Sequence, residues 1–245
     1  MYNSIPIKKI LPILGLVILA TCITRCPSPE QKMKDVTVRI DGRVAGSGVI
    51  IGKNGNNYDV LVVKHTIATQ PGQVDAPYSV VTVDEKSHNI KYKQIQQDRD
   101  VDLAIVTFQS ERTYAVADIS SQSLDKDADV FVSGWKNCTQ KPIYELTRGK
   151  VIEVKPTDIS PIDSEDGYQI KYTNSTTAGM SGSPVFNLDT KLIAIHGMSG
   201  DGKANNYDLN KCPPLSKSID SIMGNNFGIP IDIFLKSSIG RKNGN

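Results

Sequence analysis

Short apolar segments separated by turn residues run through the sequence from about residue 36 to residue 233. The clearest pair is 49–51 and 58–63, which the turn-forming tripeptide Asn54-Gly55-Asn56 separates as in a β-hairpin. Further strands are expected at residues 36–40, 78–83, 90–96, 102–108, 128–133, 143–145, 149–154, 168–172, 183–186, 191–196 and 227–233. Because short strands spaced by turns are typical of β-barrels, the sequence predicts an all-β fold, with residues 231–237 closing the chain as a short helix.

Two halves are predicted, because residues 109–127 are polar and poor in strand-forming residues and are interpreted as the connection between them. This division assigns residues 35–118 to an N-terminal barrel and residues 119–240 to a C-terminal barrel. The preceding segment, 27–34, is polar and is interpreted as a linker. His88, which lies among charged and polar residues, is expected to be a solvated loop residue without a role.

Residues 1–26 have the pattern of an export signal or a membrane anchor. The basic pair Lys8-Lys9 precedes an uncharged apolar run over residues 10–23, which is too short for an ordinary spanning helix. Three outcomes stay open: cleavage near residues 19–22, attachment of lipid to Cys22 in a box that loosely resembles that of bacterial lipoproteins, or an uncleaved anchor in the inner membrane. Each outcome places the folded part outside the cytoplasm, in the periplasm or secreted.

Cysteine usage and net charge limit which bonds, metals and partners the folded part is expected to have. Cys22 and Cys26 lie in the targeting region, so only Cys138 and Cys212 remain, either as one disulfide or as two thiols. Neither has a second Cys or a His at metal-ligand spacing, so no metal site and no cofactor are expected. The net charge of +2 comes with scattered Lys and Arg, which disfavours nucleic acid as a partner.

The most informative segment is the glycine-flanked turn around Ser181, which is part of the run 176–186. A serine hydroxyl is a poor nucleophile at neutral pH and needs a base together with N–H groups aimed at the developing oxyanion. Gly179 can take backbone angles that turn its N–H toward the same point as the N–H of Ser181. Gly182 lets the chain leave the turn without crowding a substrate.

Two further segments supply partners for Ser181. His65 ends an apolar strand, and Asp102 begins another, where a buried carboxylate needs a partner. Asp100 competes for this role but does not directly precede the apolar run. The chain order His, Asp, Ser differs from the orders of subtilisins and α/β-hydrolases.

These motifs resemble the trypsin-like (chymotrypsin-fold) serine peptidases over most of the chain, from about residue 36 to residue 235. The second half is most similar to the bacterial glutamyl endopeptidase branch, on the runs 175–177, 181–187 and 195–197 together with Gly179. The resemblance implies two six-stranded antiparallel β-barrels with the active site in the cleft between them. It also implies a serine endopeptidase that acts on protein or peptide substrates through an acyl-enzyme.

Carried over by position, the resemblance assigns each catalytic role. Ser181 attacks the scissile carbonyl, His65 serves as base and then acid, Asp102 orients His65, and the amides of Gly179 and Ser181 form the oxyanion hole. The chain also departs from the pattern. Met180 stands where trypsin-like zymogens carry an Asp, so activation through an N-terminal ion pair is not expected.

A specificity pocket is expected beside the nucleophile, with Ser175 and Thr176 at its floor and residues 196–199 (His196, Gly197 and Ser199 among them) at its wall. Ser175 offers no carboxylate, which disfavours basic substrates. Thr176 and His196 can donate hydrogen bonds, so a preference for Glu, and less for Asp, is expected before the scissile bond. The alternative is that His196 is a core residue and the pocket takes small neutral side chains.

In related folds the loop around Cys138 borders this pocket, and Cys212 lies in a polar insertion over residues 201–224 on its other rim. A Cys138–Cys212 disulfide is therefore expected to hold the insertion over the cleft. The competing functional hypothesis is a catalytically silent homologue that binds protein. The oligomeric state stays open.

Overall fold

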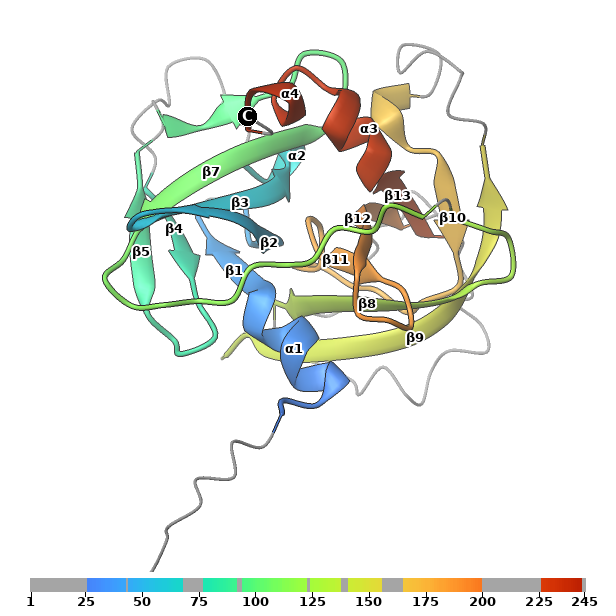
Figure 1. The fold of residues 1–245 in the computed structure, drawn as a ribbon, viewed down its shortest axis with the longest axis horizontal. Helices are drawn as coiled ribbons and strands as arrows, with labels where there is room; N and C mark the ends of the chain where they lie inside the picture. Colours follow the sequence, from blue (N-terminus) through green and yellow to red (C-terminus); the bar gives the residue numbers. More distant parts are fainter. Residues whose placement is uncertain are drawn as a thin grey trace, which may run out of the picture.

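The computed structural model describes residues 26–42, 44–67, 77–91, 94–122, 124–137, 141–155, 165–199 and 226–243. Two β-structures lie side by side, the first half on the left of Figure 1 and the second on the right. Among the described residues, no helix is both long and apolar enough to span a membrane. The predicted all-β class with two halves and a short C-terminal helix is therefore the observed architecture.

The first half is a seven-stranded sheet with the order β5-β4-β1-β2-β3-β7-β6. Its strands are β1 (Thr37–Asp41), β2 (Gly46–Asn54), β3 (Asn57–Val63), β4 (Tyr78–Val81), β5 (Ser87–Ile90), β6 (Gln96–Gln97) and β7 (Leu103–Gln109). The predicted 54–56 turn joins β2 to β3, and Gly55 takes a positive φ of 59° there. The strand expected at 90–96 is wrong, since only β5 and the two-residue β6 form at its ends.

The first half also differs from the expected six-stranded closed barrel. Its described strands form no hydrogen-bonded ladder between β5 and β7, yet the two strands meet through side chains. The ring of His88 lies 4.5 Å from that of Phe108, centroid to centroid. The sheet therefore curls onto itself and is held at this seam by packing rather than by backbone pairing.

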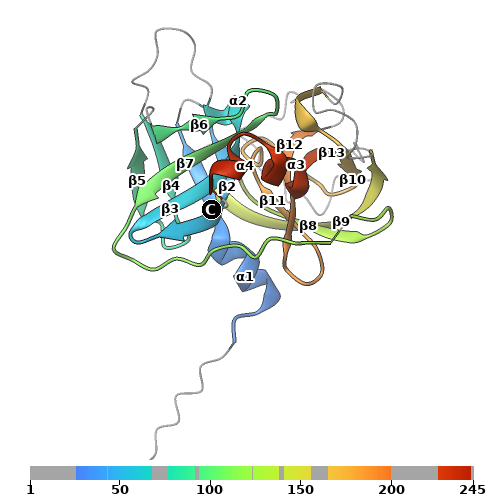
Figure 2. The same ribbon diagram turned by 45° about the horizontal axis from the view of Figure 1, so that its top comes forward.

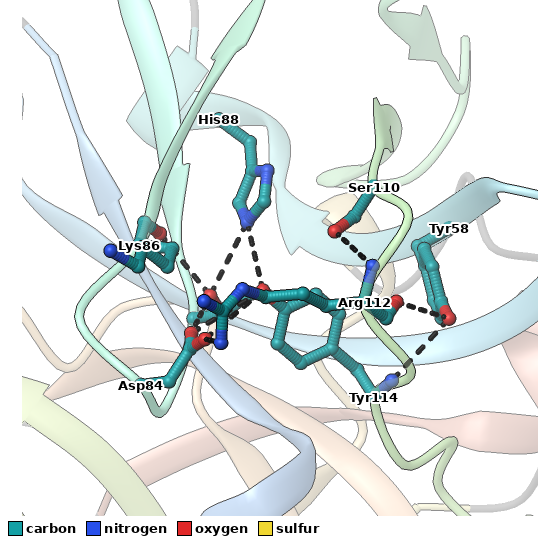
Figure 3. A network of polar contacts seen from close by, with 8 residues as sticks. Tyr58, Asp84, Lys86, His88, Ser110, Arg112 and Tyr114 are labelled. Atoms are coloured by element: carbon teal, nitrogen blue, oxygen red, sulfur yellow. Dashed lines mark hydrogen bonds and ion pairs between the residues drawn. The ribbon is translucent and has the colours of Figure 1, made fainter.

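A polar network extends this seam (Figure 3). His88 Nε2 lies 3.3 Å from the Tyr114 hydroxyl, and Asp84 accepts hydrogen bonds from Tyr114 (3.3 Å) and Arg112 (3.2 Å). His88 is thus half-buried in a strand, and burial lowers its pKa. The prediction of a solvated loop histidine is wrong, because the rings of Phe108 in β7 and of Tyr114 beyond it pack against His88.

The second half is a closed barrel with the order β10-β13-β12-β11-β8-β9. Its strands are β8 (Asp129–Lys136), β9 (Ile143–Val154), β10 (Ile170–Tyr172), β11 (Pro184–Phe186), β12 (Leu192–Ser199) and β13 (Asn226–Pro230). The two strands expected at 143–145 and 149–154 are one continuous strand, β9, because β8 pairs with it without interruption from Lys136 to Asp129. Figure 2 shows the barrel beside the first sheet from a second direction.

The segment predicted as a linker, 27–34, is largely helical instead. Helix α1 (Pro29–Val36) begins at Ser28, whose side chain accepts a hydrogen bond from the N–H of Gln31. Proline at the first helical position and Glu30 in the first turn also suit a helix start. The polar composition hid this helix, whose Met33 is only 2% exposed.

Four short helical elements complete the fold: α2 (Lys64–Ile67), η3 (Glu165–Gly167), α3 (Ile231–Lys236) and α4 (Gly240–Asn243). Helix α3 is the predicted C-terminal helix. One hydrophobic cluster joins the two halves with helices α1 and α3. Its largest contributors include Met33, Val36, Leu61, Leu103, Ile105, Phe186, Ile195, Ile229 and Phe234.

Candidate active site

The first half brings His65 and Asp102 together at one edge of its sheet. Strands β3 and β7 are antiparallel with Val63 opposite Leu103, so the residues just after β3 face those just before β7. His65 Nδ1 lies 2.6 Å from Asp102 Oδ2. The backbone N–H of His65 also donates to Asp102 Oδ1 at 2.9 Å. Both carboxylate oxygens therefore face the histidine.

Burial separates the two members of this pair. The Asp102 side chain is 9% exposed, whereas that of His65 is 42% exposed and so can meet a substrate. Burial acts to raise the pKa of Asp102, but the hydrogen bond and the charge of His65 and the hydroxyl of Tyr168 outweigh it, so the pKa lies below its ordinary value. The competing Asp100 is exposed and has no contact of this kind with His65.

Ser181 lies in a tight turn of the second half. Gly179 and Gly182 take positive φ angles of 93° and 89°, which favour glycine. In the described part of the chain, no group accepts a hydrogen bond from the N–H of Gly179 or of Ser181. Two backbone donors thus stay available on either side of Met180, as an oxyanion site requires.

The turn is held from the first half by Ser47. Its hydroxyl donates to the carbonyl of Gly179 at 2.9 Å and accepts from the N–H of Trp135 at 2.9 Å. Its N–H donates to the carbonyl of Ser181 at 2.8 Å. A Cβ on Gly182 would overlap the Ser47 carbonyl, so only glycine allows this close approach.

Ser181 lies near the segment that contains His65, but the two residues are not hydrogen-bonded to each other. A Cβ on Gly46 would lie 3.0 Å from Thr66 Cγ2 and 3.2 Å from the Ser181 carbonyl, so both flank Gly46. The Ser181 hydroxyl donates to the carbonyl of Gly197 at 3.3 Å. Although both residues are described, no hydrogen bond joins Ser181 to His65 in this arrangement.

The expected pocket residues lie along β12 and the segment before the turn. The Thr176 hydroxyl donates to Asn226 Oδ1 at 2.7 Å, and Ser175 beside it is half-buried. Ser199 ends β12 opposite Asn226. Cys138, Cys212 and the insertion 201–224 lie outside the described residues. Cys26, the one cysteine in the described ranges, is exposed and unpaired.

His196 is 3% exposed, and its Nδ1 lies 2.6 Å from the Tyr172 hydroxyl. Burial, and secondarily the charge of His65, lower the pKa of His196 to about 3. The histidine is therefore neutral over the ordinary pH range. The burial of its side chain against Tyr172 makes His196 a core residue of the barrel.

Three contributors escaped the sequence analysis: Tyr168, Ser47 and Asn226. Tyr168 donates to Asp102 Oδ2 at 2.6 Å across the boundary between the halves. Ser47 stands between two glycines just before the expected strand 49–51, and Asn226 directly precedes the expected strand 227–233. No local pattern identifies them, because each acts on a residue more than 45 positions away.

Comparison with known proteins identifies the family of this chain. Residues 46–195 match the trypsin-like peptidase domain. The chain belongs to this family. A search of curated proteins gives no significant match.

Among solved structures, this trypsin-like chain is similar to Deg5, with 20% identity, a TM-score of 0.61, and 85% of this chain and 89% of that one covered. It is also similar to the Rv3671c protease in its inactive form, with 15% identity, a TM-score of 0.58, and 87% and 91% covered. An inactive serine-to-alanine mutant of Rv3671c from M. tuberculosis H37Rv gives 15% identity, a TM-score of 0.56, and 82% and 83% covered. At these identities, the likeness supports the fold.

Proposed function

We propose that this protein is a serine endopeptidase in which Ser181 is the nucleophile, His65 the general base and Asp102 the residue that orients it. The observation that carries this proposal is the contact between the buried Asp102 carboxylate and His65 Nδ1. The serine turn, with its two available N–H donors, lies on the other side of Gly46 from the segment that holds His65. Membership of the trypsin-like peptidase family supports a serine protease.

The proposed reaction follows from these positions. Ser181 Oγ attacks the scissile carbonyl carbon while its proton passes to His65 Nε2, and the N–H groups of Gly179 and Ser181 bind the oxyanion. His65 then gives the proton to the leaving amine, which departs and leaves an acyl-enzyme. Water attacks the ester with His65 again as base, and the acid product leaves with Ser181 restored.

In this structure the Ser181 hydroxyl points to the Gly197 carbonyl. Catalytic hydrogen bonds are often long or misaligned without substrate and tighten in the complex. We therefore expect the hydroxyl to turn from Gly197 to His65 when a substrate fills the cleft. Asp102 already holds the imidazole with Nε2 as the remaining ring nitrogen for this proton transfer.

The test is Ser181→Ala on an unstructured protein substrate. We expect turnover to fall about 10⁶-fold, as for other serine peptidase knockouts. Ser183→Ala is the matched control, since Ser183 is two residues away and its buried hydroxyl has no hydrogen-bond partner among the described residues. If the wild type cleaves nothing but retains protein in pull-down, the catalytically silent homologue is the better description. Activity that survives Ser181→Ala would reject the nucleophile.

We further propose that the enzyme prefers Glu, and less strongly Asp, before the scissile bond, as in the glutamyl endopeptidase branch. The Thr176 hydroxyl now donates to Asn226 Oδ1, and a bound carboxylate would replace this amide as a stronger acceptor. The Tyr172 hydroxyl can donate either to the Phe227 carbonyl at 3.3 Å or to His196 Nδ1 at 2.6 Å, and in the second case His196 would offer Nε2–H as a second, uncharged donor.

A peptide library that varies the residue before the scissile bond tests this preference. Thr176→Val should lower kcat/KM for Glu peptides about tenfold or more while leaving Ala peptides nearly unchanged, since one hydrogen bond to a charged group is lost. Thr107→Val, in the first sheet, is the control. Equal cleavage after Ala, Val and Glu by the wild type would reject the acidic preference and leave the peptidase proposal intact.

Export and a Cys138–Cys212 disulfide are proposed on the sequence patterns alone. Mass spectrometry of the mature N-terminus distinguishes cleavage near 19–22, lipid on Cys22 and an uncleaved anchor. A count of thiols on the unreduced folded part tests the disulfide. Two reactive thiols beyond Cys26 would reject it.

A further inference from the structure

Tyr168 makes the shortest contact that the second half offers to the proposed catalytic aspartate. Its hydroxyl donates to Asp102 Oδ2 at 2.6 Å, the same oxygen that lies 2.6 Å from His65 Nδ1. Tyr168 is 5% exposed and belongs to the hydrophobic cluster that joins the halves. A carboxylate oxygen has two lone pairs, so Oδ2 can accept from both donors at once.

The backbone around Tyr168 makes this contact a fixed one. The carbonyl of Asp166 accepts from the N–H of Asp102 at 2.9 Å. Gly167, with a φ of 90°, brings the chain so close that a Cβ there would lie 2.9 Å from Val101 Cγ1. The turn that ends η3 is therefore seated on the Asp102 loop, and Tyr168 follows from it directly.

Gly197 supplies the room that the Tyr168 ring needs. A Cβ on Gly197 would overlap the Tyr168 hydroxyl oxygen and lie 2.5 Å from Cζ of its ring. Gly197 lies at a register shift of β12 between His196 and Met198, and its carbonyl is the acceptor of the Ser181 hydroxyl. The Tyr168 ring can therefore occupy this position only because residue 197 has no side chain.

We infer that Tyr168 is a positioning residue for the reaction: its hydroxyl fixes the Asp102 carboxylate, and through it the His65 ring, from the position that a side chain at residue 197 would otherwise occupy. This inference rests on the proposed function of His65, Asp102 and Ser181. It explains why a large polar side chain is buried between the halves with its hydroxyl directed at a carboxylate. Tyr168 touches neither substrate nor the reacting atoms.

The first test is Tyr168→Phe, which keeps the ring and removes the hydroxyl. We expect kcat to fall about tenfold to a hundredfold with KM changed less than about twofold, since the Asp102 carboxylate, and with it the His65 ring, loses the hydrogen bond that fixes its orientation. The acidic limb of the kcat/KM profile should move to higher pH, by up to about one unit, because Asp102 then directs more negative charge at His65.

Among the described residues, His196 also lies within reach of the charge of His65, and the titratable groups around the pair guide the interpretation of the pH profile. Asp102 and His65 are in contact, and Asp166 and Asp102 both act on the Tyr168 hydroxyl by their charge. Lys64 donates to the carbonyls of Asp98 and Val101 rather than to the carboxylate.

Tyr58→Phe is the matched control, since it keeps the ring of another buried tyrosine and removes a hydroxyl that donates to the carbonyl of Arg112 at 3.0 Å. It should change neither kcat nor the pH profile.

A side-chain exchange provides the second test. Tyr168→Ala removes the ring that occupies the space of a side chain at residue 197, and Gly197→Ser then carries a hydroxyl close to the place of the tyrosine oxygen. We expect Tyr168→Ala/Gly197→Ser to recover at least about tenfold in kcat over Tyr168→Ala/Gly197→Ala, which has the same backbone and no hydroxyl. Both double variants carry the same cavity, so lost packing cancels in the comparison.

The outcomes separate this inference from the function on which it rests. If Ser181→Ala retains activity, the peptidase proposal itself fails. If Ser181→Ala is inactive but Tyr168→Phe matches the wild type in kcat and in pH profile, or if the serine and alanine double variants are equal, the positioning role is overturned and the proposed function stands.

Discussion

The two halves of the molecule differ in how far their proposed catalytic residues are already in contact. In the first half, His65 and Asp102 are already in contact, because they flank two strands, β3 and β7, that pair within one sheet. In the second half, Ser181 is hydrogen-bonded within its own barrel, to Gly197, and not to the histidine. The histidine and the aspartate that orients it are therefore in place within the first half alone. Whether Ser181 can reach the histidine depends on how the two halves pack together.

The halves also differ in how they close. The second is a barrel closed by backbone hydrogen bonds, while the first is a curled sheet sealed by the rings and polar groups of Figure 3. Beyond the hydrophobic cluster that joins the halves, polar contacts link them directly at the site, with Ser47 on the serine turn and Tyr168 on Asp102. These two polar contacts bear directly on the alignment of the site, and each can be removed separately by a substitution.

Asp102→Asn should break the assembled pair of the first half and have the largest effect. We expect kcat to fall about 10⁴-fold, because the amide cannot hold the His65 tautomer that accepts the serine proton. Asp98→Asn is the control: Asp98 accepts from Ser238 and is equally buried, so its loss should lower stability with kcat nearly kept. Steady-state kinetics on one peptide, with thermal unfolding of both variants, checks this. Equal kcat losses would contradict the comparison.

Acid should weaken the second half through His196. Its folded pKa of about 3 lies below the ordinary 6.5, so unfolded chains bind the proton first, and the unfolding free energy falls as pH drops from about 6.5 toward 3. We expect a loss on the order of a few kcal/mol. The contribution of Asp102, whose pKa is lowered, is lost only below its ordinary value of 3.8. Denaturant unfolding from pH 7 to pH 4 measures the slope.

His196→Gln supplies the control for this acid effect. The amide can still accept from the Tyr172 hydroxyl but does not titrate, so the slope between pH 6.5 and pH 4 should flatten. A slope identical to that of the wild type would show that other groups cause the acid sensitivity.

Ser47→Ala should loosen the contact between the halves and have the smallest effect of the three. It leaves the carbonyl of Gly179 and the N–H of Trp135 without their partner, which should cost about 1–2 kcal/mol of stability and about tenfold in kcat. Ser133→Ala removes another buried hydroxyl between the halves, bonded to Thr37 at 2.7 Å, far less directly tied to the serine turn. It should lower stability and spare kcat. Equal kcat values for both variants would deny Ser47 its role.

Local sequence patterns predicted some elements of the fold correctly and missed others. Strand period and turn residues placed most strands of both halves, and Asp102 beside an apolar run pointed to a buried carboxylate that needs a partner. The helix at 29–36 was missed, since its polar face dominates a segment that presents only Met33 and Val36 to the core. The uninterrupted β9 was split in two by a polar stretch that its partner β8 holds in register.

By itself, the sequence determined an all-β chain of two halves, with a histidine and an aspartate at strand ends and a serine between glycines. These features are local, since strand propensity, turn chemistry and the freedom of glycine act over a few residues. Only the tertiary structure decided that the first sheet curls without closing, that Ser47 holds the serine turn, and that Tyr168 reaches Asp102 through the space left at Gly197. Such contacts join residues distant in the chain, and no short-range pattern records them.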